Sequence, residues 1–128
     1  MHDIPVIEFV RPMNGFADHD RYALVQVDGD GVLCELRSLD DHDLRFLVVP
    51  PLPFFPDYAP VVGDDVVADL GITDPDAVLV LVVLKAGATL AETTANLLAP
   101  VLVNPANRRA AQIVLDDADL SVTTPLVA

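Results

Sequence analysis

The chain alternates short apolar runs with polar turns, and most runs have the length of a β-strand rather than a helix. Many are rich in β-branched and aromatic residues, which suit a half-buried pleated surface. The strongest local signal is the Asp28–Gly31 turn (Asp-Gly-Asp-Gly) between two such runs, which predicts a hairpin. The predicted strands are Ile4–Phe9, Tyr22–Val27, Val32–Leu36, Arg45–Val49, Val78–Leu84, Leu97–Val103 and Gln112–Leu115.

Only one segment has a convincing helical pattern, with Val66, Val67 and Leu70 on one face. Asp64 is expected to cap its start, Asp65 suits the positive end of the helix dipole, and the glycine at position 71 fits its end. Further single turns are expected after Thr73 and before Thr93. The pattern therefore predicts a single mostly-β domain over residues 1–128, an antiparallel or mixed β pseudo-barrel of about seven strands with one short helix.

Prolines interrupt this pattern at two places. Pro100 lies inside a predicted strand, so an edge or a bulge is expected there. The other place is the segment Leu47–Tyr58, where a strand leads into four prolines, two phenylalanines and a tyrosine. Proline fixes φ and removes a backbone donor, so this segment predicts a stiff connection leaving the sheet. Aromatic side chains held on such a loop are expected to pack against the fold or to be presented to a partner.

Composition narrows the class of protein. A length of 128 residues suits one domain with a real core, and 52% hydrophobic residues exclude a disordered chain. The longest apolar run, Ala77–Leu84, has eight residues and is too short to span a membrane. The first five residues have no signal-peptide pattern, and the lone Cys34 is expected to be buried without a disulfide partner. These features indicate the cytoplasm.

Charge is the next constraint. Twenty acidic residues against seven basic ones give a net charge of −13, which argues against direct nucleic-acid binding. A negative field of this size can steer a basic partner, or it can serve solubility alone.

No pattern indicates an enzyme, a metal site or a cofactor. The Asp28–Gly31 turn lacks the later oxygen ligands of a calcium loop, and the acidic Asp40–Asp43 turn has no distant Cys/His pair to complete a metal site. Asp116 and Asp117 are adjacent in a predicted strand, so their carboxylates are expected to diverge. His2, His19 and His42 lie in polar settings and are expected to be exposed.

Several motifs in one order resemble the flagellar assembly factor family (FliW). They are Phe9 with Asn14-Gly15-Phe16, the stretch Leu36–Phe46, Gly71–Val80 and Asn96–Pro100. Asn14, Arg37 and His42 stand where the family more often has proline, glutamine and proline. Many members also have an extra opening strand of about a dozen residues. If that strand closes the barrel, another segment must cover an exposed edge here.

The resemblance implies a non-enzymatic partner switch in the cytoplasm. Members bind newly made flagellin and also the RNA-binding translational repressor CsrA; CsrA held by the factor releases flagellin messenger RNA. A monomer without cofactors, membrane contact or direct nucleic-acid binding is expected. Asp64 and Asp65 are possible contacts for basic patches of CsrA. The candidate partner-binding residues are Phe54, Phe55, Asp57, Tyr58, Asn96, Asn104, Asn107, Arg108 and Arg109.

These candidates have structural alternatives. Phe54 and Phe55 are also suited to closing one end of the barrel, whereas Tyr58 is expected to be the more exposed aromatic. Tyr58→Ala is therefore expected to weaken the binding of at least one partner and to shift the melting temperature by only a few degrees. The Asn104–Arg109 connection is expected to hold side chains that are not part of the core. Asn96 would either contact a partner or satisfy a bulge at Pro100. Two other functions stay open: a metal-dependent enzyme using the Asp40–Asp43 turn, and an acidic structural subunit that self-associates through an open strand edge.

Overall fold

The computed structural model describes residues 4–13, 15–29, 32–117 and 119–127, and it contains nine strands within these residues. The strands are β1 (Ile4–Arg11), β2 (Arg21–Gln26), β3 (Cys34–Ser38), β4 (Arg45–Val49), β5 (Leu79–Lys85), β6 (Thr94–Ala95), β7 (Val101–Asn104), β8 (Arg109–Gln112) and β9 (Thr124–Pro125). One α-helix, α1 (Asp64–Leu70), and two single 3-10 turns, Pro75–Ala77 and Leu90–Glu92, complete the described elements.

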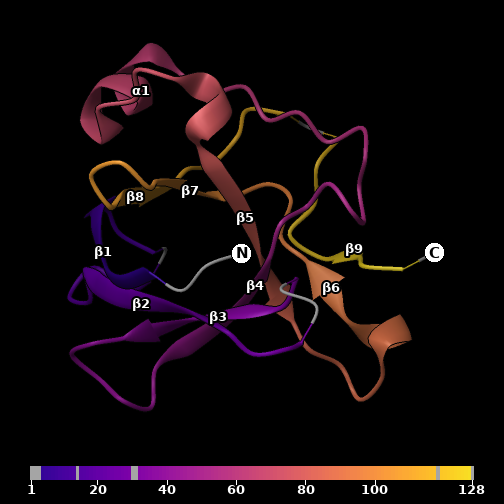
Figure 1. Cartoon of the computed structure of the whole chain (residues 1–128). Helices are drawn as coiled ribbons and strands as arrows, with labels where there is room; N and C mark the ends of the chain where they lie inside the picture. Colours follow the sequence, from indigo (N-terminus) through magenta and orange to yellow (C-terminus); the bar gives the residue numbers. More distant parts are fainter. Residues whose placement is uncertain (1–3, 14, 30–31, 118, 128) are drawn as a thin grey trace.

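Seven of these strands close into a barrel. Their order is β4-β3-β2-β1-β8-β7-β5, and β5 pairs back to β4 through Val48–Val83 and Val49–Val82. The β1–β8 pair is parallel and the other pairs are antiparallel, so the sheet is mixed. The predicted seven-stranded pseudo-barrel is confirmed (Figure 1). The ring closes through β1 and β8, so the barrel does not need the extra opening strand that was considered above.

Alternation along each strand sends one set of side chains into the barrel and the other outward. On β7, Val101 and Val103 join the interior cluster, which also holds Ile7, Phe9, Tyr22 and Leu36. Leu102, between them, belongs to a cluster beneath α1 with Val66 and Leu70. The apolar face of α1 therefore covers the outer side of β7 and β8, as Figure 1 shows.

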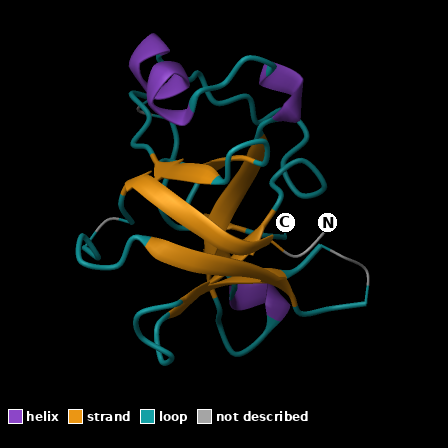
Figure 2. Cartoon of the chain, turned by 60° about the vertical axis from the view of Figure 1, so that its left-hand side comes forward, coloured by secondary structure: helices purple, strands orange, loops and turns teal. Residues whose placement is uncertain are grey.

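A second layer covers the outer side of β4 and β5. Val48 points into the barrel, whereas Val49 and Val82 join a separate cluster with Leu84, Ala95, Leu97 and Leu126. The short strands β6 and β9 pair with each other, and β6 pairs with the end of β5. In Figure 2 the strands fill the middle of the molecule, and the helical turns lie outside them.

Several boundaries differ from those predicted. Strand β7 begins only at Val101, because the buried Pro100 precedes the regular ladder, and it includes Asn104. Strand β8 covers Arg109–Gln112, so the predicted strand Gln112–Leu115 was three residues too late. The two-residue strands β6 and β9 were missed. Helix α1 is capped by Gly63 with no side-chain cap, so the prediction that Asp64 caps it was wrong.

Other predictions are confirmed. The glycine at position 71 ends α1 in a left-handed conformation, with φ of 63°. β2 and β3 form the expected hairpin, although β3 begins at Cys34 rather than Val32. Cys34 is buried. His2, Asn14 and two residues of the predicted hairpin turn, Asp30 and Gly31, lie outside the described residues.

Candidate partner-binding surface

The aromatic-proline segment folds back onto the outer side of the barrel. Main-chain bonds from Phe54 and Phe55 to the Pro51 carbonyl, at 3.0 and 2.7 Å, turn the chain immediately after β4. Phe54, Phe55 and Tyr58 are all half-buried and pack against the cluster that contains Val49 and Val82. They therefore cover the outer face of β4 and β5, and the expectation that the phenylalanines close an end of the barrel was wrong.

Tyr58 is not the exposed member of this group. Its hydroxyl donates a 2.6 Å hydrogen bond to the Leu97 carbonyl, and its ring packs in the outer cluster. Burial raises the pKa of Tyr58 to about 12, because the charged phenolate is disfavoured away from water. Tyr58 therefore links the loop to the segment before β7, while Asp57 beside it is exposed.

Two of the candidate asparagines hold the end of α1. Asn104 is 5% exposed, and its amide donates to the carbonyls of Leu70, at 2.9 Å, and of Gly71, at 3.3 Å. Asn107 donates to the same Leu70 carbonyl at 2.8 Å. These carbonyls are among the groups that a helix leaves unpaired at its C-terminus. The expectation that no side chain of this connection is part of the core was wrong for Asn104.

The two arginines of the same turn remain at the surface. Arg108 is exposed and has a φ of 60°, a left-handed conformation in the β7–β8 turn. Arg109 is also exposed and makes one long contact, 3.4 Å, with the Asp69 carbonyl. Both are accessible to an acidic surface of a partner.

Asn96 satisfies the irregular approach to β7. Its side-chain oxygen accepts a 3.0 Å hydrogen bond from the Ala99 main chain, just before Pro100. This is the bulge-satisfying alternative predicted from the sequence, and Asn96 is half-buried.

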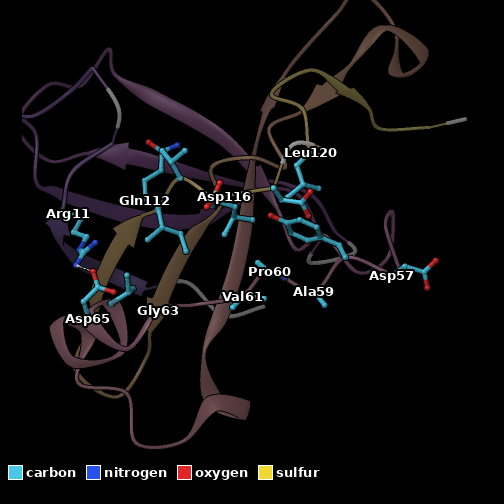
Figure 3. A pocket seen from close by; sticks show the side chains of 16 residues that line it. Arg11, Asp57, Ala59, Pro60, Val61, Gly63, Asp65, Gln112, Asp116 and Leu120 are labelled. Atoms are coloured by element: carbon cyan, nitrogen blue, oxygen red, sulfur yellow. Dashed lines mark hydrogen bonds and ion pairs between the residues drawn. The ribbon is translucent and has the colours of Figure 1, made fainter.

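A groove beside α1 contains residues that the sequence did not single out. Its volume is about 800 Å³, and its two walls are the loop Tyr58–Gly63 and the segment Gln112–Asp117 (Figure 3). Val61 and Val114, from opposite walls, are 85% and 66% exposed. The only available signal in the sequence was apolar residues at positions that the strand pattern did not bury.

The groove is negatively charged. Its one basic residue, Arg11 at the end of β1, forms ion pairs with Asp65 at 3.0 Å and with Asp69 at 2.8 Å. The hydrogen bond from Arg11 lowers the pKa of Asp65. Asp116 and Asp117 line the same groove, because the chain after β8 is no longer a regular strand. Asp116 and Asp117 are therefore not in the regular strand from which their divergence was expected. Asp57 also lines the rim, and Figure 3 shows its side chain pointing away from the others.

The acidic turn Asp40–Asp43 makes local contacts. Asp40 pairs with Arg21 at 2.8 Å, and the Asp41 carboxylate accepts from the Asp43 main chain. His42 is exposed, whereas His19 is half-buried rather than exposed. Across the described part of the chain, no three His, Cys, Asp or Glu side chains lie close enough together to hold a metal ion. No described helix is long and apolar enough to cross a membrane.

Comparisons with known proteins agree on one family. A family model described as "FliW protein" matches residues 1–126. The flagellar assembly factor FliW of Symbiobacterium thermophilum is 34% identical over 122 residues, covering 94% of this chain and 88% of that protein. The protein of the same name from Ruminiclostridium cellulolyticum is 36% identical over 121 residues, covering 94% and 82%. A crystal structure of a flagellar assembly factor FliW superposes with a TM-score of 0.90 and 25% identity, covering all of this chain and 89% of that one.

Proposed function

The chain belongs to the FliW family, and we propose that it is a non-enzymatic, cytoplasmic partner switch that binds flagellin and antagonises the translational regulator CsrA. The observation that carries the proposal is the match of the family model over residues 1–126. Relatives across most of its length are named flagellar assembly factors, which supports a role in flagellar assembly.

The proposed switch is a competition between two ligands for one small protein. When flagellin is scarce, the protein holds CsrA and flagellin messenger RNA is released for translation. When flagellin accumulates, it occupies the protein, and free CsrA represses its messenger again. Each ligand must lower the affinity for the other by the same factor, because binding free energies in a closed cycle are linked.

The surfaces proposed for these partners are the exposed parts of the two candidate segments. On the aromatic loop they are Asp57 and the half-buried faces of Phe54 and Phe55. On the β7–β8 turn they are Arg108 and Arg109, whose side chains are exposed. Asn96, Asn104, Asn107 and Tyr58 hold the fold through the hydrogen bonds above, and their contribution to binding would be to position these segments.

Titration calorimetry tests the proposal directly. Flagellin from the same genome is titrated into the purified protein, first alone and then with CsrA present. The proposal expects one-to-one binding of flagellin that CsrA weakens. Binding of flagellin that is indifferent to CsrA would leave an escort without the regulatory role, and binding of neither partner would contradict the proposal.

A charge-matched pair of variants separates the arginine turn from general electrostatics. Arg108→Ala/Arg109→Ala is compared with Arg37→Ala/Arg45→Ala, which removes two positive charges from β3 and β4. If the turn is a partner surface, the first variant lowers the affinity for flagellin or for CsrA at least tenfold more than the second variant does. Equal effects would remove the turn from the candidate surfaces.

A further inference from the structure

We propose that the groove beside α1 docks an extended, basic segment of a partner protein, which pairs as a short strand with the main chain of Val114–Asp116. The inference stands on the geometry of this groove, and it holds whichever partners the preceding proposal assigns to the protein.

The open edge of the sheet begins where β1 ends. β8 is paired on both sides, in parallel with β1 and antiparallel to β7. The last residue of β1 is Arg11, whose partner is Ala111, and the next residue is Pro12. Proline has no N–H and cannot continue the ladder as a donor. The chain after β8 therefore loses its neighbour on the β1 side.

The main-chain groups after β8 point alternately toward β7 and toward the open side. Ile113 and Leu115 donate to the carbonyls of Pro100, at 3.1 Å, and Leu98, at 2.8 Å, on the β7 side. Along an extended segment, alternate residues turn their main-chain groups to opposite sides. Val114 and Asp116 therefore face the side that β1 has left. Among the described residues, no main-chain carbonyl accepts a hydrogen bond from the N–H group of Val114 or Asp116.

The space on the open side is a groove. The groove of about 800 Å³ lies along this edge, and Val61 from the opposite wall is 85% exposed. An extended strand that adds to a free sheet edge gains affinity from main-chain hydrogen bonds and specificity from pockets for alternate side chains. Val61 and Val114 supply apolar contacts for such side chains.

The acidic lining of the groove favours a basic segment as its occupant. Asp116 and Asp117 lie along the open edge, whereas Arg11 is already paired with two acids. A segment carrying lysine or arginine between apolar residues complements this lining. A second copy of the chain is disfavoured, because each copy carries a net charge of −13.

The test uses the whole chain and a defined peptide. The probe is a blocked hexapeptide of alternating lysine and valine, titrated into isotopically labelled protein and followed by amide chemical shifts. The proposal expects shifts concentrated at Val61, Val114 and Asp116, with hydrogen-exchange protection of the Val114 and Asp116 amides. Shifts scattered over the surface, or no binding up to millimolar peptide, would overturn it.

Two matched controls distinguish strand pairing from charge attraction. The same peptide N-methylated along one edge keeps its side chains and charge but loses its donors on that edge, and it should bind at least tenfold more weakly. Asp116→Asn/Asp117→Asn should weaken the unmodified peptide at least fivefold, whereas Asp18→Asn/Asp43→Asn, which removes two exposed charges elsewhere, should not. Equal binding of the methylated peptide, or equal loss in both variants, would overturn the proposal.

Light scattering tests the other occupant. If the protein dimerises without peptide, and the Val114 and Asp116 amides are protected in the dimer, the groove is a self-association site and the proposal fails. A monomer with exchanging amides at these two positions is the expected result.

Discussion

At the scale of single residues, the Leu70 carbonyl at the end of α1 is held by two asparagine side chains. Asn104 reaches it from the end of β7 and Asn107 from the following turn, at 2.9 and 2.8 Å. Asn104 is buried. The pair connects the helix to the barrel through polar groups rather than through apolar contact alone.

Asn104→Ala is expected to destabilise the protein by about 1–3 kcal/mol, because it removes two donors to buried or partly buried helix carbonyls. Asn107→Ala should cost less, about 0.5–1.5 kcal/mol, because Asn104 still donates to Leu70. Urea denaturation of both variants checks the order. An Asn107 variant less stable than the Asn104 variant would contradict the assigned roles.

Tyr58→Phe removes only the hydroxyl that donates to the Leu97 carbonyl, and it should cost about 0.5–1.5 kcal/mol. Tyr58→Ala should cost more, since it also leaves a gap in the outer cluster. The expectation that Tyr58→Ala barely shifts the melting temperature does not fit this packing. Thermal melts of the two variants give the comparison, and equal melting temperatures would show that the ring contributes nothing.

The raised pKa of Tyr58 predicts that the stability of the protein falls at alkaline pH. The folded pKa is about 12, above the ordinary value of 10.0, so the unfolded chain loses its proton first as the pH rises. The stability contributed by the neutral hydroxyl is complete below pH 10 and declines as the pH rises toward 12. The urea midpoint of the wild type should fall more steeply over this range than that of Tyr58→Phe. Parallel curves would contradict the assignment.

The sequence identified these segments but not the roles of their side chains. The sequence of a Pro-containing turn does not show whether its asparagine and arginine side chains face water or the end of a helix. Asn104 and Asn107 are distinguished from Arg108 only by where α1 lies, which depends on packing 34 or more residues away in sequence. Hydrogen bonds between segments so far apart leave no local pattern.

At the scale of elements, the end of α1 is the joint between the helix and the chain leading to β5. Gly71 has φ of 63° and donates its main-chain N–H to the Ala68 carbonyl. A Cβ added there would lie 3.0 Å from the Asn107 side-chain nitrogen. The glycine is therefore required both by the backbone conformation and by the polar joint beneath it.

Gly71→Ala is expected to destabilise the protein by about 1–2 kcal/mol, from the left-handed conformation and the close approach to Asn107. Gly29→Ala is the matched control, because its added Cβ meets no atom within 4 Å. The free energies of unfolding in urea should differ by that amount. A control as unstable as Gly71→Ala would show that chain flexibility, not this joint, sets the cost.

Elements with a strong pattern were predictable, and those formed by tertiary contact were not. Arg45–Val49 matches β4 at both ends, and the predicted helix matches α1 except that Asp64 belongs to the helix instead of capping it. The two-residue strands β6 and β9 have no periodicity to detect, since they exist only through pairing with each other and with β5. The boundary of β8 was misplaced because Ile113, which is buried, and Leu115, which is partly buried, form main-chain hydrogen bonds without forming a regular ladder.

At the scale of the whole molecule, a closed barrel supports surfaces on its outer side. The aromatic loop, the β7–β8 turn and the groove beside α1 all lie outside the ring of strands. The hydrogen-bonded ring of strands connects the elements that carry these segments. The net charge of −13 produces a negative field that salt screens, and such a field can speed encounter with a basic partner.

The most direct test of the partner switch is the binding of CsrA to flagellin messenger RNA from the same genome. CsrA bound to the labelled leader is titrated with this protein, and flagellin is then added to the same mixture. The expected result is that the protein releases the RNA from CsrA and that flagellin restores the CsrA–RNA complex. RNA binding by CsrA that is unchanged by saturating protein would contradict the proposed switch.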